Sequence, residues 1–420
     1  MTKKQLELYI HIPFCVKKCE YCDFLSFPAD EPAQRRYLIA LLKEVEYYGM
    51  RTDGYRVSSI FIGGGTPSSI NAEWIRRILD TVRRRYDLAE DAEITIECNP
   101  GTLTPQKLEI YKKAGVNRLS IGLQSTLDEE LKTLGRIHTY EEFLESYRAA
   151  RDAGFYNINI DLMSGLPYQT PEKFQKTLYE VIGLRPAHIS VYSLIIEKGT
   201  PFWDHYQKDL ALQKAGKRTK ALPDEDTEYT IYKMTQRMLA EEGFAQYEIS
   251  NYARPGWECR HNCGYWTGVD YLGIGLGASS YFEGYRFSNT SDMQKYLRLI
   301  PDLYMSAVDR SEKLGFMVMD QEKLDRLDEG KLLGQVHKEL TRMDETSRME
   351  EFMFLGLRMI CGVSKEEFYR RFGKDMQEVY GEQLADLSEK ELLIEEEDRV
   401  YLTERGLDLG NYCMAKFLLS

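Results

Sequence analysis

The chain has 420 residues and a formal net charge of −12, with 43% hydrophobic and 29% charged residues. This length exceeds what one hydrophobic core usually serves, so at least two domains are expected. The acidic balance argues against nucleic acid as a partner, because phosphate neutralisation needs a basic surface. No apolar run is long enough to span a bilayer, and the N-terminal stretch lacks the features of a signal peptide. We therefore expect a cytoplasmic protein.

Short apolar or β-branched runs alternate with amphipathic segments through the first half of the chain. The runs are Leu6–Ile12, Val57–Ile62, Glu93–Cys98, Arg118–Leu123, Tyr156–Leu162 and His188–Leu194. The amphipathic segments are Ala33–Tyr48, Ala72–Tyr86, Pro105–Ala114, Tyr140–Ala153 and Pro171–Ile182. This alternation predicts βαβ units and a parallel sheet. Thr104-Pro105 and Thr170-Pro171 are typical helix starts, with an N-cap followed by proline.

Polar groups follow most of the predicted strands directly. They are Gly63–Thr66, Glu97, Gln124, Asp161 and Tyr192-Ser193. In a barrel, the C-terminal ends of successive strands converge on one site, whereas in a doubly wound sheet only the strands at the switch point do. The sequence therefore predicts an α/β fold, a partial (β/α)6 TIM-type barrel over residues 1–230.

The second half has a different composition, with another helix expected over Asp224–Gly243. Residues 231–308 form an aromatic and glycine-rich linking region, and residues 309–348 a polar insertion or mobile segment. Residues 349–420 suggest a separate winged-helix-like domain, preceded by a mixed α+β region. In that domain we expect a helix ended by Gly362 and a capping box from Ser364 to Glu367.

Three cysteines, Cys15, Cys19 and Cys22, lie within eight residues in the spacing C-x3-C-x2-C. Clustered thiols in a reducing compartment indicate metal or redox chemistry. A structural zinc site has four ligands. Here the fourth would be a residue remote in the sequence, or His11. A [4Fe–4S] cluster bound by three cysteines leaves one iron open, and the spacing on a loop after a strand favours it. The lone cysteines Cys98, Cys361 and Cys413 are expected to be small buried apolar residues.

Several polar residues could bind a small molecule at the open iron. The glycines of "GGGTP", 63–67, allow close approach of a ligand to the backbone. Glu97 could accept hydrogen bonds from ribose hydroxyls, Gln124 and Asp161 could add others, and Arg136 could bind a carboxylate.

The cysteine motif with Tyr21, "GGGTP", "IECNP", "LSIGLQS", "LGRIH" and "NIDLMSGLP" resembles the radical S-adenosylmethionine superfamily. It is most similar to the branch with oxygen-independent coproporphyrinogen III dehydrogenase and the related haem chaperones. The resemblance implies a [4Fe–4S] cluster on Cys15, Cys19 and Cys22. It also implies an S-adenosylmethionine site, formed by Tyr9, Tyr21, Gly64, Gly65, Thr66, Glu97, Gln124, Arg136 and Asp161.

Two differences between this chain and the dehydrogenase favour the chaperone type within that branch. Phe24 stands where the dehydrogenase has a further cysteine, and only fourteen residues precede Cys15, so most of the dehydrogenase's N-terminal extension is missing. The segment "RHNCGYW" matches the H-N-x-x-Y-W pattern of the chaperones. The candidate haem-binding residues are therefore His261, Asn262, Tyr265 and Trp266.

The leading hypothesis is a haem chaperone that binds haem, the cluster and S-adenosylmethionine and delivers haem to respiratory haemoproteins. One alternative is a radical oxidoreductase acting on a porphyrinogen, and another is a zinc-binding structural module. The resemblance suggests a homodimer and leaves a peripheral membrane contact open. Whether S-adenosylmethionine is only bound or also cleaved does not follow from these residues.

Overall fold

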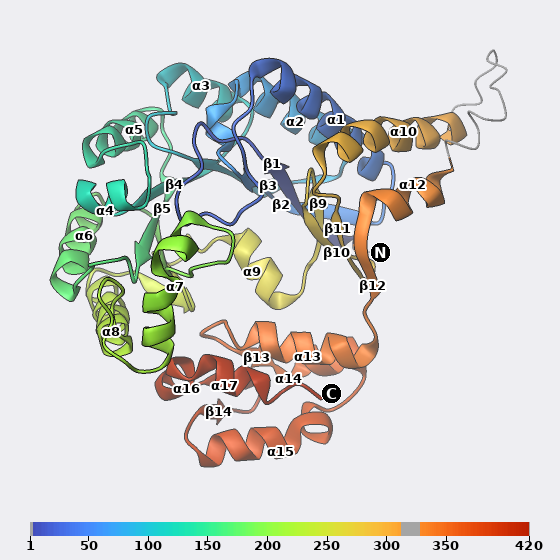
Figure 1. The fold of residues 1–420 in the computed structure, drawn as a ribbon. Coiled ribbons are helices and arrows are strands. Elements are labelled where there is room, and N and C mark those ends of the chain that lie inside the picture. Colours follow the sequence, from blue (N-terminus) through green and yellow to red (C-terminus); the bar gives the residue numbers. More distant parts are fainter. Residues whose placement is uncertain (1–2, 312–327, 420) are drawn as a thin grey trace.

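The computed structural model describes residues 3–311 and 328–419. The chain forms a partial barrel with a small helical domain at its side (Figure 1). Part of the predicted polar segment, 312–327, lies outside the described residues. Within the described ranges, no helix is both long and apolar enough to cross a membrane.

Six parallel strands form the barrel, and they are neighbours in chain order. The strands are β1 (Lys4–Ile12), β2 (Tyr55–Gly64), β3 (Leu88–Cys98), β4 (Arg118–Gln124), β5 (Asn157–Ser164) and β6 (His188–Ser193). Helices and one short turn connect them: α1 (Glu31–Gly49), η1 (Pro67–Ser69), α2 (Ala72–Arg85), α3 (Pro105–Lys113), α4 (Asp128–Thr133), α5 (Tyr140–Asp152) and α6 (Pro171–Gly183). The strand order has no reversal, so the fold is the predicted partial barrel and not a doubly wound sheet.

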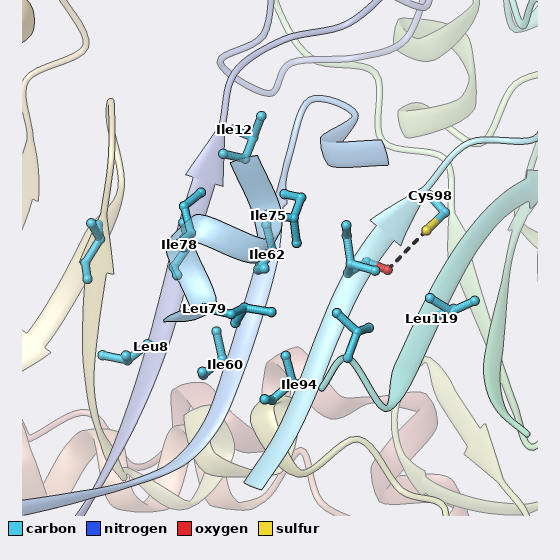
Figure 2. Packing of buried hydrophobic residues seen from close by; sticks show 14 of the residues in the cluster. Leu8, Ile12, Ile60, Ile62, Ile75, Ile78, Leu79, Ile94, Cys98 and Leu119 are labelled. Atoms are coloured by element: carbon cyan, nitrogen blue, oxygen red, sulfur yellow. Dashed lines mark hydrogen bonds between the residues drawn. The ribbon is translucent and has the colours of Figure 1, made fainter. Parts of the chain in front are cut away.

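The outer face of the strands and the inner face of the helices share one apolar core. Figure 2 shows Ile60, Ile62 and Ile94 of the sheet beside side chains of α2, all fully or almost fully buried. Each such side chain contributes about 1.5–3 kcal/mol through burial. The predicted helix starts are confirmed, since the hydroxyls of Thr104 and Thr170 accept hydrogen bonds from N–H groups of the first turn.

The sheet continues beyond the barrel at both edges, to twelve strands. Next to β1 lie β9 (Asp270–Ile274), β10 (Ser279–Phe282), β11 (Tyr285–Asn289) and β12 (His337–Arg342), and next to β6 lie β8 (Asn251–Ala253) and β7 (Ala245–Glu248). The remaining helices of this part are α7 (Pro201–Lys214), α8 (Glu225–Glu241), α9 (Arg260–Thr267), α10 (Met293–Ser311) and α12 (Glu329–Val336). Figure 1 shows α9 between the barrel strands and the C-terminal helices.

A buried carboxylate, Glu44 of α1, ties the added strands to the barrel. Its oxygens accept hydrogen bonds from Gly275 N at 2.9 Å, from Asn289 Nδ2 at 2.6 Å and from the Tyr296 hydroxyl. The first two groups belong to the β9–β11 region and the third to α10. The glutamate therefore holds three segments that are far apart in sequence.

The C-terminal residues have their own hydrophobic cluster, from Met349 to Phe417. Their elements are α13 (Glu345–Gly356), β13 (Val363–Ser364), α14 (Lys365–Phe372), α15 (Met376–Glu389), β14 (Leu393–Glu395), β15 (Arg399–Leu402), α16 (Glu404–Asp408) and α17 (Gly410–Ala415). The order helix, strand, two helices and hairpin is that of a winged helix. The division into domains stays a prediction.

Three local expectations in this domain are corrected. Helix α13 ends at Gly356 and not at Gly362, because the chain leaves the helix to pair with β7 through Ile360 N and Tyr247 O at 3.0 Å. Cys361, in that departing segment, is exposed and not buried, whereas Cys98 and Cys413 are buried as predicted. Only one of the two hydrogen bonds of the capping box forms. The Ser364 hydroxyl accepts from Glu367 N, but the Glu367 carboxylate pairs with Arg370 and Arg371 and not with the Ser364 backbone.

Candidate functional site

The three clustered cysteines lie on a loop that leaves the C-terminal end of β1. The base of this loop is closed by two backbone hydrogen bonds, Cys15 N to Phe27 O at 3.2 Å and Phe27 N to Pro13 O at 2.9 Å. A further bond, Cys22 N to Cys19 O at 3.3 Å, makes a tight turn between the second and third cysteines. All three thiols are half-buried. They are therefore held on one loop and are partly accessible from outside.

Hydrogen-bond donors from other loops lie next to two of the sulfur atoms. The Thr66 hydroxyl is 3.5 Å from Cys15 Sγ, and Arg136 Nη1 is 3.6 Å from Cys19 Sγ. Donors and positive charge at this distance stabilise thiolates, which are the form that binds iron. Burial raises the pKa of Cys22, whose Sγ lies 4.0 Å from the Ser26 hydroxyl.

The glycines of the segment 63–67 are needed where the cysteine loop crosses the end of β2. A Cβ on Gly65 would lie 2.7 Å from Phe14 O and 3.0 Å from Cys15 Sγ. Gly64 has a φ of +116°, a conformation that side chains disfavour, and faces the His11 ring. The glycines thus let the first cysteine lie directly against the backbone of β2.

These residues fit an iron–sulfur cluster. Within residues 3–311 and 328–419, no three His, Cys, Asp or Glu side chains are arranged around a point as ligands of one metal ion. A four-iron cluster does not require that arrangement, because each cysteine binds a different iron. The shared loop, the partial exposure and the donors to sulfur suit such a cluster.

The polar residues predicted at the strand ends converge at the barrel mouth beside this loop. Glu97 Oε2 accepts a hydrogen bond from Gly64 N at 2.9 Å. Burial, with the charge of Asp161 as a second cause, raises the pKa of Glu97 to about 7. Asp161 accepts from the Ser120 hydroxyl at 2.9 Å and from Asn159 Nδ2 at 2.8 Å, and burial raises its pKa. The two carboxyl groups are acceptors suited to hydroxyl and amino donors of a ligand.

Gln124 and Arg136 complete this side of the mouth. Gln124 ends β4 with a φ of 74°, a strained backbone for a residue other than glycine. Arg136 Nη2 donates to Gly122 O at 2.7 Å and to Asn99 Oδ1 at 2.9 Å, and its Nε is buried without a hydrogen-bond partner in the described part of the chain. A guanidinium held in this way has donor capacity left for an anionic ligand.

Sequence reasoning missed Asn99, which connects the two donors to sulfur. Its Nδ2 donates to the Thr66 hydroxyl at 3.1 Å, while its Oδ1 accepts from Arg136. The signal was the segment "IECNP", in which Asn99 follows Glu97 by two residues at the end of β3. Asn99 therefore orients the groups that contact Cys15 and Cys19.

The two tyrosines predicted here contact different parts of the site. The Tyr9 hydroxyl is 3.1 Å from His11 Nδ1, before the start of the cysteine loop. Burial raises the pKa of Tyr9. Tyr21 lies between the second and third cysteines, and its ring contacts Phe202 at a centroid distance of 6.3 Å. Tyr21 thus anchors the loop against the segment that follows β6.

Replacing Glu97 with glutamine is expected to change how stability depends on pH. The folded-state pKa of about 7 is above the usual value of 4.5, so the folded protein keeps a proton that the unfolded chain loses. Stability therefore falls as pH rises from about 4.5 to about 7. This decrease should be absent in the Glu97→Gln variant. The free energy of unfolding of the variant, compared with that of the wild type, should therefore be about 1–2 kcal/mol higher at pH 8 than at pH 5. Denaturant titrations of both proteins at these pH values test this, and identical pH dependence would contradict it.

The residues of the predicted haem motif lie on α9, which packs against β2 and α13. His261 is 1% exposed, its Nδ1 is 2.8 Å from the Ser59 hydroxyl, and its Nε2 is 2.9 Å from the Tyr265 hydroxyl. Tyr265 and Trp266 line a cleft beside the C-terminal domain, and Asn262 is half-buried. His261 is thus buried, whereas Tyr265, which contacts it, and Trp266 reach the cleft from the same helix.

Comparisons with known proteins show the family and the fold of the chain. Residues 9–180 match the family model of the radical SAM superfamily, and residues 343–409 match that of the HemN C-terminal domain. The solved structure of coproporphyrinogen III oxidase (HemN) from Escherichia coli superposes with a TM-score of 0.75 at 24% identity, over 99% of this chain and 91% of that one. This likeness shows the fold.

Two of the curated relatives match over nearly the whole length of both chains. The protein named heme chaperone HemW of Bacillus subtilis is 36% identical over 98% of both chains, and that of Lactococcus lactis is 33% identical over 100% of this chain and 99% of its own. HemW of Escherichia coli is 44% identical over 65% of this chain and 69% of its own. A radical SAM family implies a [4Fe–4S] cluster and S-adenosylmethionine as cofactors. The chain therefore belongs to the radical SAM superfamily and, within it, to the family of the heme chaperone HemW.

Proposed function

We propose that this protein is a haem chaperone that binds haem and transfers it to respiratory haemoproteins. The observation that carries this proposal is the similarity to curated heme chaperones, which extends over 98% of both chains. Phe24 supports it, because it stands at the position where the dehydrogenase type has a cysteine, and its side chain is 71% exposed beside the candidate cluster site.

We assign the cluster to Cys15, Cys19 and Cys22 and the S-adenosylmethionine site to the polar residues of the barrel mouth. In this assignment Arg136 binds the carboxylate of the ligand, Glu97 accepts from its ribose, and Gly64 and Gly65 provide the surface on which it lies. The remaining contacts come from Tyr9, Tyr21, Thr66, Gln124 and Asp161. A reduced cluster held by these cysteines would be able to supply an electron to S-adenosylmethionine bound in the barrel mouth.

Transfer of haem from the anaerobically reconstituted full-length protein tests the proposed function. We expect stoichiometric haem binding in a Soret titration, followed by transfer to an apo-haemoprotein of a respiratory complex. A parallel assay follows coproporphyrinogen III with reductant and S-adenosylmethionine. Catalytic turnover there without haem binding would overturn the chaperone proposal in favour of the oxidoreductase. One zinc and no sulfide per chain would favour the structural module. A homodimer and a peripheral membrane contact stay predictions.

A further inference from the structure

Asn99 connects two segments that both contact the cysteine loop. Its Nδ2 donates to the Thr66 hydroxyl at 3.1 Å, and its Oδ1 accepts from Arg136 Nη2 at 2.9 Å. The Thr66 hydroxyl in turn donates to Cys15 Sγ at 3.5 Å. Arg136 Nη1 donates to Cys19 Sγ at 3.6 Å. One amide side chain therefore stands behind the donors to two of the three clustered sulfur atoms.

The direction of these hydrogen bonds follows from the chemistry of the partners. A guanidinium has donors only, so the atom of Asn99 that faces Arg136 is its oxygen, and its NH2 group faces Thr66. The Thr66 hydroxyl accepts from this NH2 group, and its own hydrogen is therefore left for the sulfur atom of Cys15. The orientation of one amide thus directs a hydrogen toward each of the two sulfur atoms.

The main chain holds Asn99 firmly in this orientation. Asn99 N donates to Ser68 Oγ at 3.1 Å, and Asn99 O accepts from Thr102 Oγ1 at 2.6 Å. The hydroxyls of Ser68 and Thr102 are themselves 2.6 Å apart. Pro100 follows Asn99 and restricts the backbone of the preceding residue to extended conformations. The amide is therefore preorganised by the end of β3 and does not depend on a ligand for its position.

Donors to sulfur affect the two redox states of an iron–sulfur cluster differently. Reduction adds negative charge, part of which resides on the thiolate ligands. Hydrogen bonds to sulfur and nearby positive charge therefore stabilise the reduced state more than the oxidised state and raise the reduction potential. Arg136 is also anchored by its bond to Gly122 O at 2.7 Å, so the Thr66 donor depends on Asn99 more than the arginine does.

We propose that Asn99 is a positioning residue that sets the reduction potential of the [4Fe–4S] cluster. It acts on Cys15 through the Thr66 hydroxyl, and on Cys19 through the Arg136 guanidinium. This inference rests on the proposed function, and within it on the cluster assigned to the three cysteines. By raising the potential, Asn99 makes the cluster easier to reduce.

Redox titrations of the anaerobically reconstituted full-length protein, followed by electron paramagnetic resonance, test the role of Asn99. We expect Asn99→Ala to lower the equilibrium constant for one-electron reduction about tenfold, which is about 59 mV. Asn99→Asp should lower it at least as much, because its carboxylate attracts the hydrogen of the Thr66 hydroxyl and adds a negative charge. S-adenosylmethionine is left out, so that ligand binding by Arg136 does not enter the measurement.

A double-mutant cycle with Thr66 separates positioning from a general loosening of the site. Thr66→Val removes the donor to Cys15 with little change in side-chain volume. Adding Asn99→Ala to this variant should lower the potential by less than Asn99→Ala does in the wild type, because part of the effect of Asn99 is already lost. A side chain that only stiffened these segments would change the potential by the same amount in both backgrounds.

Asn117→Ala is the matched control. Asn117 also makes two side-chain hydrogen bonds to a neighbouring segment, accepting from Ile94 N at 2.8 Å and donating to Ala92 O at 2.8 Å. It directly precedes β4, at the end of the barrel away from the cysteine loop. This variant should keep the potential of the wild type. Iron and sulfide content shows that each variant carries the full cluster.

The outcomes separate this inference from the function on which it rests. Unchanged potentials in both Asn99 variants, or additive shifts in the double-mutant cycle, overturn the role of Asn99 and leave the chaperone function intact. If Asn99→Ala does not retain the cluster, Asn99→Asp in the wild-type and Thr66→Val backgrounds decides in the same way. A wild type without iron and sulfide overturns the cluster assignment, and one that holds the cluster but binds no haem overturns the chaperone function.

Discussion

Alanine at any one of Cys15, Cys19 or Cys22 is expected to abolish the iron–sulfur cluster. Each thiolate would bind a different iron, so the loss of one leaves a second iron without a protein ligand beside the open one. The three thiols lie on one short loop, and no other cysteine of that loop can substitute. Iron and acid-labile sulfide, measured after anaerobic reconstitution, should fall from about four each per chain to near zero.

Cys361→Ala is the matched control, because Cys361 is exposed and belongs to the C-terminal domain. It should keep the full iron and sulfide content. Full cluster content in Cys15→Ala, Cys19→Ala or Cys22→Ala would contradict the assignment of that ligand.

Alanine at Glu44 is expected to lower the free energy of unfolding by about 3 kcal/mol. The change leaves three buried donors without their acceptor: Gly275 N, Asn289 Nδ2 and the Tyr296 hydroxyl. It also removes the desolvated carboxyl group itself, whose pKa burial raises to about 7, so the cost is smaller than the sum of three lost hydrogen bonds. Denaturant unfolding at constant pH measures the difference.

Glu46→Ala is the control on the same helix. Glu46 is half-buried, pairs with Arg84 and Arg85, and accepts a hydrogen bond from the Tyr304 hydroxyl at 2.9 Å. Because its two ion pairs involve exposed arginines and only one partly buried donor is lost, its replacement should cost clearly less than that of Glu44, about 1 kcal/mol. The Glu44 variant should also loosen the start of the cysteine loop, because Tyr37 donates to His11 O and accepts from Leu276 N in the same polar cluster. Equal stabilities of the two variants would show that Glu44 does not hold these segments together.

The barrel could be predicted from the sequence because its units are local. Each strand–helix pair has its own periodicity, and caps such as Thr104 and Thr170 mark where helices begin. The strands added at the barrel edges could not be predicted in the same way. They are three to six residues long, and the pairings that attach them to the barrel are distant in the chain, as in Leu6 with Asp270 and His188 with Ala253. Nothing within such a short segment specifies that partner.

The candidate site also combines features that are local in the sequence with features that depend on distant residues. The spacing of the cysteines and the polar residues after each strand are local patterns, and the structure brings them together at one mouth. The surroundings of His261 depend on β2, which supplies Ser59 and Phe61 from about two hundred residues earlier. A sequence pattern identifies the histidine, but its burial and its hydrogen bond to Ser59 follow only from the tertiary fold.

The parallel pairing of β1 with β9 has a consequence for the order of events during synthesis. The strand that carries the cysteine loop gains its second neighbour only through residues Asp270–Ile274. Ribosomes add about 5–20 residues per second, so the nascent chain exposes the thiols for many seconds before this neighbour emerges. Cluster insertion into the completed site is thus a late step, and for much of translation the cysteines depend on a reducing environment to stay unoxidised.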